Sequence, residues 1–284
     1  MKNNKFTVLI LQFQKQAGII ECKMGSKGCE TGMAKILAFV NQKGGVGKTS
    51  VCYNTAWELA RQGKKILMID VDGQKANLTF FSGVPRTDSM KTIVDVLKGG
   101  ISLEDAAVPV KDNLDIIPAN MAVAELGMDA KISRFRSELK AVKDKYDYVF
   151  VDVNPSPGWG HYLSLSVTDF AVVIMLPDIA SLEGNAGILE SIAEIQETTN
   201  TKLQIAGILF NRSNDRTNLG KQVQEVAERM AAGAETTIFE TKIPQAVSLS
   251  ECVASHVGIT EYDPGSRAAE AVKGFASELE RGVM

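Results

Sequence analysis

The stretch VNQKGGVGKTS (residues 40–50) begins at the end of the apolar run ILAFV (36–40), which is typical of a buried strand. The usual phosphate-binding loop reads G-x-x-x-x-G-K-[ST], and the segment GKT (47–49) fits the end of this motif. Gln42 stands where the motif has its first glycine, and Lys43 adds a lysine that the motif does not require. Glycines let the backbone turn tightly, and backbone amides at the start of a helix bind phosphate oxygens. The stretch therefore predicts a strand, a phosphate-binding loop and a helix in succession.

The last positions of this loop have predicted roles toward a bound nucleotide. Lys48 places a positive charge near the β- and γ-phosphates, and the Thr49 hydroxyl is the expected ligand of Mg²⁺. The residues predicted to bind the nucleotide are Gly44, Gly45, Val46, Gly47, Lys48, Thr49 and Ser50. A glycine-rich turn without a ligand is the alternative, and the predicted strand–loop–helix context argues against it.

Apolar runs alternate with helical segments along the rest of the chain. The predicted strands cover residues 36–40, 65–70, 114–118, 148–152, 170–176, 203–210 and 236–239. The predicted helices cover residues 49–62, 92–98, 133–145, 182–199, 217–231 and 267–281. Nearly continuous apolar strands are typical of a parallel sheet buried on both faces, with helices as right-handed crossovers. The pattern predicts an α/β fold, a doubly wound, mostly parallel sheet flanked by helices, formed by residues 34–284 as a single domain.

Acidic residues follow two of the predicted strands. Asp70 and Asp72 lie at the end of KILMID (65–70), and Asp152 ends the run YVFVD (148–152). A single aspartate at a strand end is more often a helix cap or a turn residue. Two such ends beside a phosphate loop favour a site for metal and nucleotide, because an aspartate there can hold the water shell of the metal.

The composition limits the classes of function. The chain has 284 residues, 45% of them hydrophobic, and a formal net charge of -3, so contact with nucleic acid needs a local basic patch. Four cysteines are scattered without a C-x-x-C pair, and there are only two histidines. This pattern argues against a zinc or iron–sulfur site within one chain and favours reduced thiols in a cytoplasmic protein. No apolar run approaches the roughly 20 residues of a membrane span.

The first 33 residues differ from the rest of the chain. FTVLILQF (6–13) is too short to span a membrane, and KMGSKGCETG (23–32) is small, polar and rich in glycine. We expect a disordered leader, or an extension from an upstream start codon with Met33 as the natural beginning. A small arm that binds a membrane or a partner is the alternative.

Blocks of the sequence resemble ParA/Soj-type partition ATPases of the deviant Walker A (ParA/MinD) P-loop family. In chain order they are NQKGGVGKTS (41–50), ILMIDVDGQKANLT (66–79), YDYVFVDVNPSPG (146–158), ILFNRSNDRTNLGKQV (208–223), IPQAVSLSE (243–251) and YDPGSRAAEAV (262–272). The resemblance implies a P-loop ATPase that binds ATP and Mg²⁺ and closes as a homodimer over two nucleotides. It also implies a nucleoid-associated protein whose ATP-bound dimer binds DNA without sequence preference and whose slow hydrolysis is stimulated by a ParB-like protein.

The resemblance assigns roles to individual residues of the site. Lys43 matches the lysine that reaches across the dimer to the partner's phosphates, where it would act as an arginine finger does. Asp72 matches the residue that positions the attacking water, and Asp70 matches one that supports the loop. Catalytic roles thus fall to Lys43, Lys48 and Asp72, and metal-binding roles to Thr49, Asp72 and Asp152 at the Walker-B position.

The predicted adenine pocket matches the family, whereas two loops depart from its usual sequence. Asn211 and Pro244 stand where the family lines the adenine pocket. Gly73 replaces a proline after the second acidic position, and Asn154 replaces the first of two prolines after the Walker-B aspartate. We expect these replacements to alter loop stiffness more than chemistry.

DNA binding is the property that these departures affect most. The family typically has arginines where this chain has Gln245 and Ser248, and each lost phosphate contact weakens binding. The remaining cations predicted to contact DNA are Arg212, Arg216, Lys221 and Lys242. A solvated surface is the alternative for each of them.

Other functions of the same fold remain as alternatives. A MinD-like membrane-positioning ATPase needs a basic amphipathic C-terminal helix. Here Val272, Phe275, Ala276 and Leu279 share one face, and the charges on the polar face sum to zero, which favours packing against the core. A positioner of a cargo other than DNA stays open. The chain has no C-x-x-C motif, which argues against a scaffold for metal clusters. The first 33 residues are too few for a helix-turn-helix domain, which argues against an operator-binding repressor. The presence of Lys48, Thr49 and Asp72 argues against an adaptor that senses nucleotide without hydrolysing it.

Overall fold

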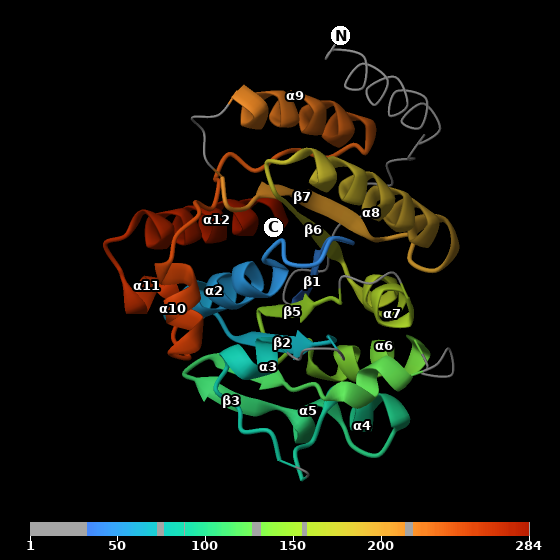
Figure 1. Ribbon diagram of the computed structural model, residues 1–284. Coiled ribbons are helices and arrows are strands. Elements are labelled where there is room, and N and C mark those ends of the chain that lie inside the picture. Colours follow the sequence, from blue (N-terminus) through green and yellow to red (C-terminus); the bar gives the residue numbers. More distant parts are fainter. Residues whose placement is uncertain are drawn as a thin grey trace.

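A seven-stranded sheet in the order β3-β4-β2-β5-β1-β6-β7 forms the centre of the computed structural model (Figure 1). The structure describes residues 33–72, 77–87, 89–126, 132–154, 158–213 and 218–283, so the leader prediction falls outside it except at Met33. The strands are β1 (Lys35–Val40), β2 (Ile66–Asp70), β3 (Val108–Lys111), β4 (Leu114–Ile117), β5 (Tyr148–Asp152), β6 (Phe170–Met175) and β7 (Gln204–Phe210). All neighbours from β4 to β7 pair in parallel. The predicted α/β fold with a mostly parallel sheet is confirmed.

The edges of the sheet differ from the prediction in two places. β3 pairs antiparallel with β4, and its short sequence VPVK was not predicted as a strand. Pro109 cannot donate a ladder hydrogen bond, which limits this segment to a sheet edge. The predicted strand 236–239 is wrong, because among the described residues it contributes only an isolated bridge between Ile238 and Ile208.

Helices cover both faces of the sheet. They are α2 (Lys48–Arg61), α3 (Asn77–Phe81), α4 (Ile93–Lys98), α5 (Leu103–Ala106), the 3₁₀ helix η1 (Met121–Glu125), α6 (Ile132–Val142), α7 (Trp159–Val167), α8 (Ile179–Thr198), α9 (Asn218–Gly233), α10 (Ser248–Ala254), α11 (Ile259–Tyr262) and α12 (Arg267–Val283). Helices α2 and α10–α12 lie on one side in Figure 1, with α6, α7 and α8 on the other. The six predicted helices are present with ends within three residues. The short helices α3, α5, η1, α10 and α11 were not predicted, and neither was α7. The α7 sequence WGHYLSLSV mixes apolar, serine and histidine side chains without a helical period.

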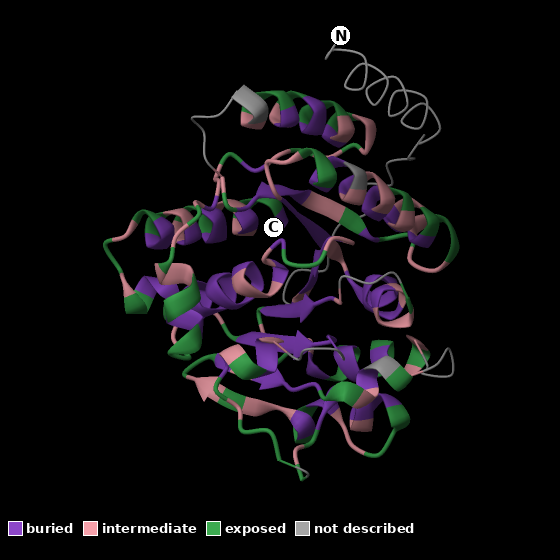
Figure 2. Ribbon diagram, viewed as in Figure 1, coloured by how far each residue is buried: buried purple, intermediate pink, exposed green. Residues whose placement is uncertain are grey.

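Two separate cores result from this double covering. Ile36, Ala38 and Val40 of β1 pack into one core, while the alternate residues Leu37 and Phe39 pack into the other. Figure 2 shows the strands between them as buried. Burial of both faces explains why the central strands are almost entirely apolar.

The last helix, α12, packs against α2. The face predicted to enter the core is buried: Val272, Phe275, Ala276 and Leu279 are each at most 2% exposed. These apolar side chains stabilise the fold and leave no apolar stripe of α12 for a lipid surface. None of the helices in the described part of the chain is long and apolar enough to cross a bilayer.

Candidate functional site

The phosphate loop connects β1 to α2 at the carboxyl edge of the sheet, where ligands of such folds bind. Gly45 and Gly47 have φ angles of 77° and 90°, in the left-handed region that favours glycine. A Cβ atom on Gly47 would collide with the side-chain amide nitrogen of Asn211. The backbone conformation therefore requires glycine at positions 45 and 47, and close packing against Asn211 is a second reason for glycine at position 47.

Lys48 and the acidic strand ends meet beside this loop. Asp70 and Asp152 are register partners on the neighbouring strands β2 and β5. Lys48, Asp72 and Asp152 are all buried, with 6%, 6% and 1% of their surfaces exposed. Burial lowers the pKa of Lys48, and the nearby charges of Asp152 and Asp72 raise it. The structure therefore brings together the lysine and the acids that the sequence placed in separate blocks.

Asp70 has a supporting position within this cluster. Its carboxylate accepts hydrogen bonds from the Asp72 amide at 3.0 Å, the Thr79 amide at 2.8 Å and the Thr79 hydroxyl at 2.7 Å. Burial raises the pKa of Asp70 to about 6, although the bonds from Thr79 and Asp72 oppose the shift. Because its oxygens are occupied by protein donors, Asp70 ties the end of β2 to α3.

Asp152 is bonded differently from Asp70. Its two oxygens are fully buried, and neither accepts a hydrogen bond of normal geometry from the described residues. Burial and the neighbouring Asp70 raise the pKa of Asp152, while the Thr49 hydroxyl and Lys48 lie close enough to lower it. A buried carboxylate without a donor beside a threonine hydroxyl suits a hard cation or its water shell, so Thr49, Asp72 and Asp152 fit a Mg²⁺ site.

His161, at the start of α7, was not predicted as part of this region. It is 4% exposed, and neither ring nitrogen has a hydrogen-bond partner among the described residues. Burial, followed by the positive charge of Lys48, lowers the pKa of His161 to about 4. The ring is therefore neutral at physiological pH and adds no charge beside Lys48. Nothing in the sequence around a single histidine indicated that it would lie near the loop.

The first residues of the loop bind to α8. The Asn41 amide donates to Asn185 at 3.0 Å, and the Gln42 amide donates to Ser191 at 3.1 Å. The Lys43 ammonium lies 3.1 Å from both carboxylate oxygens of Asp178. These α8 partners were not predicted, because they lie more than 130 positions away and no local pattern links them to the loop.

Asn211 lies beside the loop, and Pro244 lies beside Ser213, two residues further along the chain. The Asn211 amide donates to the carbonyl oxygen of Val46 at 2.7 Å, which ties the end of β7 to the phosphate loop. Pro244 forms a parallel bridge with Ser213, and the Ser213 amide donates to Ile243 at 2.9 Å. Both residues predicted to line the adenine pocket therefore lie at the same end of the sheet as the phosphate loop.

Three of the four predicted DNA-contacting cations are described, and Arg216 lies outside the described residues. Lys221 and Lys242 line a cavity of about 160 Å³ near the end of β7, together with Ser213 and Gln224. The Lys242 ammonium donates to Gln224 at 2.9 Å. Arg212 is exposed on the surface near the end of β7. These cations gather at the end of β7, and Gln245 is exposed without adding charge to them.

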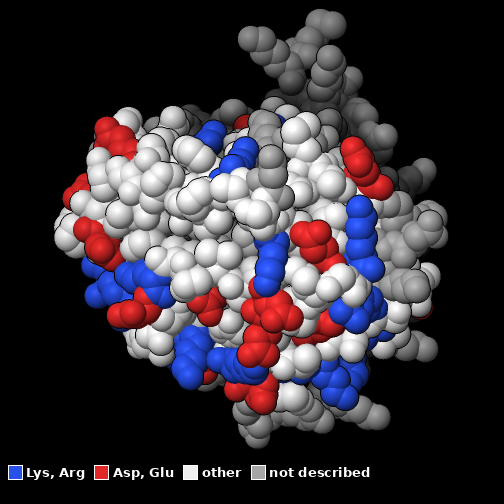
Figure 3. All heavy atoms as spheres, turned by 90° about the horizontal axis from the view of Figure 1, so that it is seen from below, with Lys and Arg blue, Asp and Glu red and all other residues white. Residues whose placement is uncertain are grey.

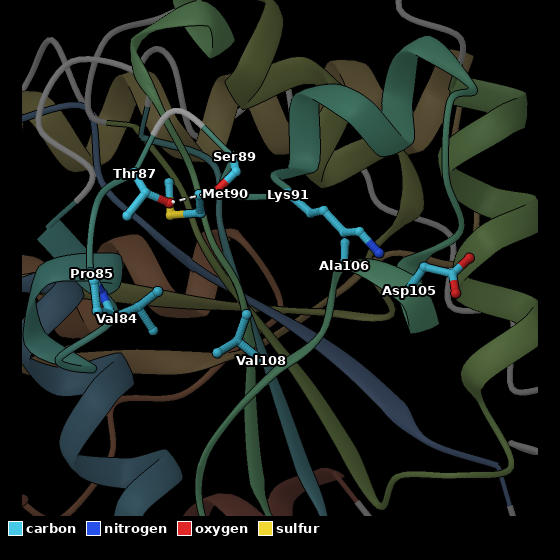
Figure 4. Close-up of a pocket in the computed structure, with 9 residues that line it drawn as sticks. All are labelled: Val84, Pro85, Thr87, Ser89, Met90, Lys91, Asp105, Ala106 and Val108. Atoms are coloured by element: carbon cyan, nitrogen blue, oxygen red, sulfur yellow. Dashed lines mark hydrogen bonds between the residues drawn. The ribbon is translucent and has the colours of Figure 1, made fainter.

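A larger cavity of about 380 Å³ lies at the β3 edge, away from the loop. Figure 4 shows Lys91 and Asp105 at one end of it and Val84 and Pro85 at the other. The surrounding face, seen from below in Figure 3, carries Lys and Arg beside Asp and Glu. Mixed charge does not attract a polyanion, so this face does not resemble a nucleic-acid surface.

Comparison with known proteins places this geometry in a family. Residues 34–205 match a family model described as an AAA domain. The sporulation initiation inhibitor protein Soj of Bacillus subtilis is 36% identical over 253 residues, which cover 87% of this chain and 98% of that protein. The chromosome partitioning protein ParA of Caulobacter vibrioides is 31% identical over 253 residues, covering 86% of this chain and 93% of that protein.

A solved structure agrees with these relatives. The septum site-determining protein MinD of Pyrococcus horikoshii, complexed with Mg-ADP, has a TM-score of 0.71 and is 25% identical. The alignment covers 88% of this chain and 97% of that one. The loop, the acidic strand ends and the sequence relatives lead to one assignment. The chain belongs to the ParA/MinD family of P-loop ATPases, together with the Soj and ParA proteins.

Proposed function

We propose that this protein binds ATP with Mg²⁺, dimerises over the nucleotides, hydrolyses ATP slowly, and uses this cycle to position DNA. The observation that supports it best is the convergence of Lys48, Asp72 and Asp152 beside a glycine-rich loop at the start of α2. Relatives crystallised with Mg-ADP or named as partitioning proteins support the same reading.

Each residue has a part in the proposed hydrolysis. The loop amides and Lys48 hold the β- and γ-phosphates, and Thr49 and Asp152 hold the metal or its water shell. A bound Mg²⁺ would neutralise charge on the phosphates. Asp72 orients the attacking water, while Asp70 keeps Asp72 in place by accepting its backbone N–H.

The dimer gives a role to the second lysine. Lys43 is not bonded to its own loop through its side chain, and about a third of that side chain is exposed. From this position Lys43 reaches the phosphates of a second copy of the chain and stabilises the charge of the transferred phosphoryl group. In this proposal dimerisation depends on ATP rather than ADP, because Lys43 contacts the γ-phosphate, which ADP lacks.

DNA and a ParB-like stimulator protein are the proposed partners. A chain with a net charge of -3 needs a local basic surface to bind DNA, and Arg212, Lys221 and Lys242 lie at one end of the sheet. The MinD-like alternative needs an exposed apolar helix face, whereas the apolar face of α12 is buried.

The experiment compares retention of the protein on random DNA fragments with ATP, with ADP and without nucleotide. The proposal predicts binding with ATP only, which weakens steeply as salt rises. The same preparations are sedimented with anionic vesicles as a control for membrane binding. Retention that does not depend on the nucleotide, or ATP-dependent binding to vesicles instead of DNA, contradicts the proposal.

A further inference from the structure

The start of the phosphate loop is held by α8 through three consecutive side chains. Asn41 donates to Asn185 and Gln42 to Ser191, both within that helix, and Lys43 binds Asp178, the residue that caps its beginning. The loop backbone is set by the same contacts, because the Lys43 amide donates to the Asn41 side chain at 2.6 Å. Lys43 therefore leaves the loop in a defined direction, toward α8.

Close packing of loop and helix makes this arrangement specific. A Cβ atom on Gly187 would lie 2.5 Å from the Gln42 side chain. A Cβ atom on Gly184 would lie 3.4 Å from Asn41 and 3.6 Å from the Cβ of Lys43. Two glycines on one face of α8 thus allow the helix to approach the loop closely, which brings Asp178 within reach of Lys43.

Asp178 has two functions in this structure that can be separated. Its side chain caps α8 by accepting a hydrogen bond from the Ser181 amide at 2.8 Å, and it pairs with the Lys43 ammonium. Burial raises the pKa of Asp178, but the bonds from Lys43 and Ser181 outweigh it and lower the pKa overall. The carboxylate is therefore ionised and available to compete for Lys43.

We propose that Asp178 is a positioning residue that holds Lys43 within its own protomer until a second, ATP-loaded copy of the chain offers its phosphates. This inference rests on the proposed function, in which Lys43 acts across the dimer. Each protomer then exchanges a Lys43–Asp178 pair for a Lys43–phosphate contact. The pair is partly exposed, at 33% and 40%, so it is weak enough for a triphosphate to displace.

The test is the substitution Asp178→Asn, which removes the charge and keeps an oxygen that caps α8. Sedimentation velocity with ATP gives the dimer dissociation constant. We expect it to fall roughly threefold to tenfold, since two weak pairs no longer oppose association. Glu190→Gln, which removes an exposed charge from the same helix, is the matched control and should leave the constant unchanged.

The same substitution in a Lys43→Ala chain shows whether Asp178 acts through Lys43 or through a general effect on charge or folding. In a chain that carries Lys43→Ala, Asp178→Asn should change the dimer constant much less than in the wild type. Thermal unfolding checks the helix cap, and Asp178→Ser replaces the asparagine variant if that one unfolds early. An unchanged or raised dissociation constant, or the same fall without Lys43, overturns the inference while the ATP-dependent dimer stands. A wild-type chain that never dimerises with ATP overturns the proposed function and this inference with it.

Discussion

The two ends of the candidate site are built in different ways. Around Lys48, Asp70 and Asp152, side chains are buried and constrained by neighbouring strands. Around Lys221 and Lys242, the cations line a small cavity near the surface, where the Lys242 ammonium donates to Gln224. The nucleotide end therefore tolerates few substitutions, whereas the proposed DNA end contributes through summed charge. A single substitution at the nucleotide end should have a large effect on activity or stability. At the proposed DNA end, single substitutions should have small effects on DNA binding that add up.

The largest effect is expected from Lys43→Ala. If Lys43 stabilises the transferred phosphoryl group across the dimer, stimulated turnover should fall on the order of a thousandfold, as for loss of an arginine finger. ATP affinity should change little, because Lys48 and the loop amides remain. Turnover is measured as phosphate release with DNA and the stimulator, and affinity with a fluorescent ATP analogue. Full stimulated turnover from a monomeric Lys43→Ala protein would refute the role across the dimer.

The next effect separates two neighbouring aspartates. Asp72→Asn should lower hydrolysis about a hundredfold or more, because it removes the group that orients the attacking water, with little change in thermal stability. Asp70→Asn should instead destabilise the fold by about 1–3 kcal/mol, since it leaves a buried donor facing the Thr79 amide. Denaturant unfolding and phosphate release are compared for both variants. Equal stability losses would contradict the division of roles.

A glycine pair tests the packing of the loop. Gly47→Ala should destabilise the loop by about 1–3 kcal/mol through its positive φ, and the collision with Asn211 should add to this. Gly45→Ala is the matched control, because its φ is also positive but a Cβ there meets nothing within 4 Å. ATP affinity by calorimetry should fall more for Gly47→Ala than for Gly45→Ala. Equal losses would mean that Asn211 moves aside without cost.

The smallest effect is expected at the DNA end. The double variant Lys221→Ala with Lys242→Ala should weaken ATP-dependent DNA binding several-fold and reduce the slope of log affinity against log salt by about 1–2. ATP hydrolysis without DNA should stay unchanged. Lys98→Ala, an exposed lysine on α4, is the control for loss of one positive charge. An unchanged salt slope would remove these lysines from the DNA surface.

The predictions made from sequence succeeded where local chemistry is self-contained. Apolar runs identified β1, β2 and β4–β7 within one residue, because burial on both faces leaves little freedom of composition. The same reasoning missed β3, whose four residues contain a proline, and missed α7, whose mixture of apolar and small polar residues has no helical period. It also mistook 236–239 for a strand, because a short apolar run does not reveal whether a neighbour is available to pair along its length.

The sequence by itself determined the strand–loop–helix context of the phosphate loop, the acidic strand ends and the order of β1, β2 and β4–β7, since each depends on residues close together in the chain. Only the tertiary structure decided that Asp70 accepts hydrogen bonds from Thr79, whereas Asp152 accepts none of normal geometry from the described residues, and that His161 lies near Lys48. It alone decided that Asp178 pairs with Lys43. The physical reason is that hydrogen bonds and ion pairs act over a few ångströms, and the fold brings together residues that lie more than a hundred positions apart.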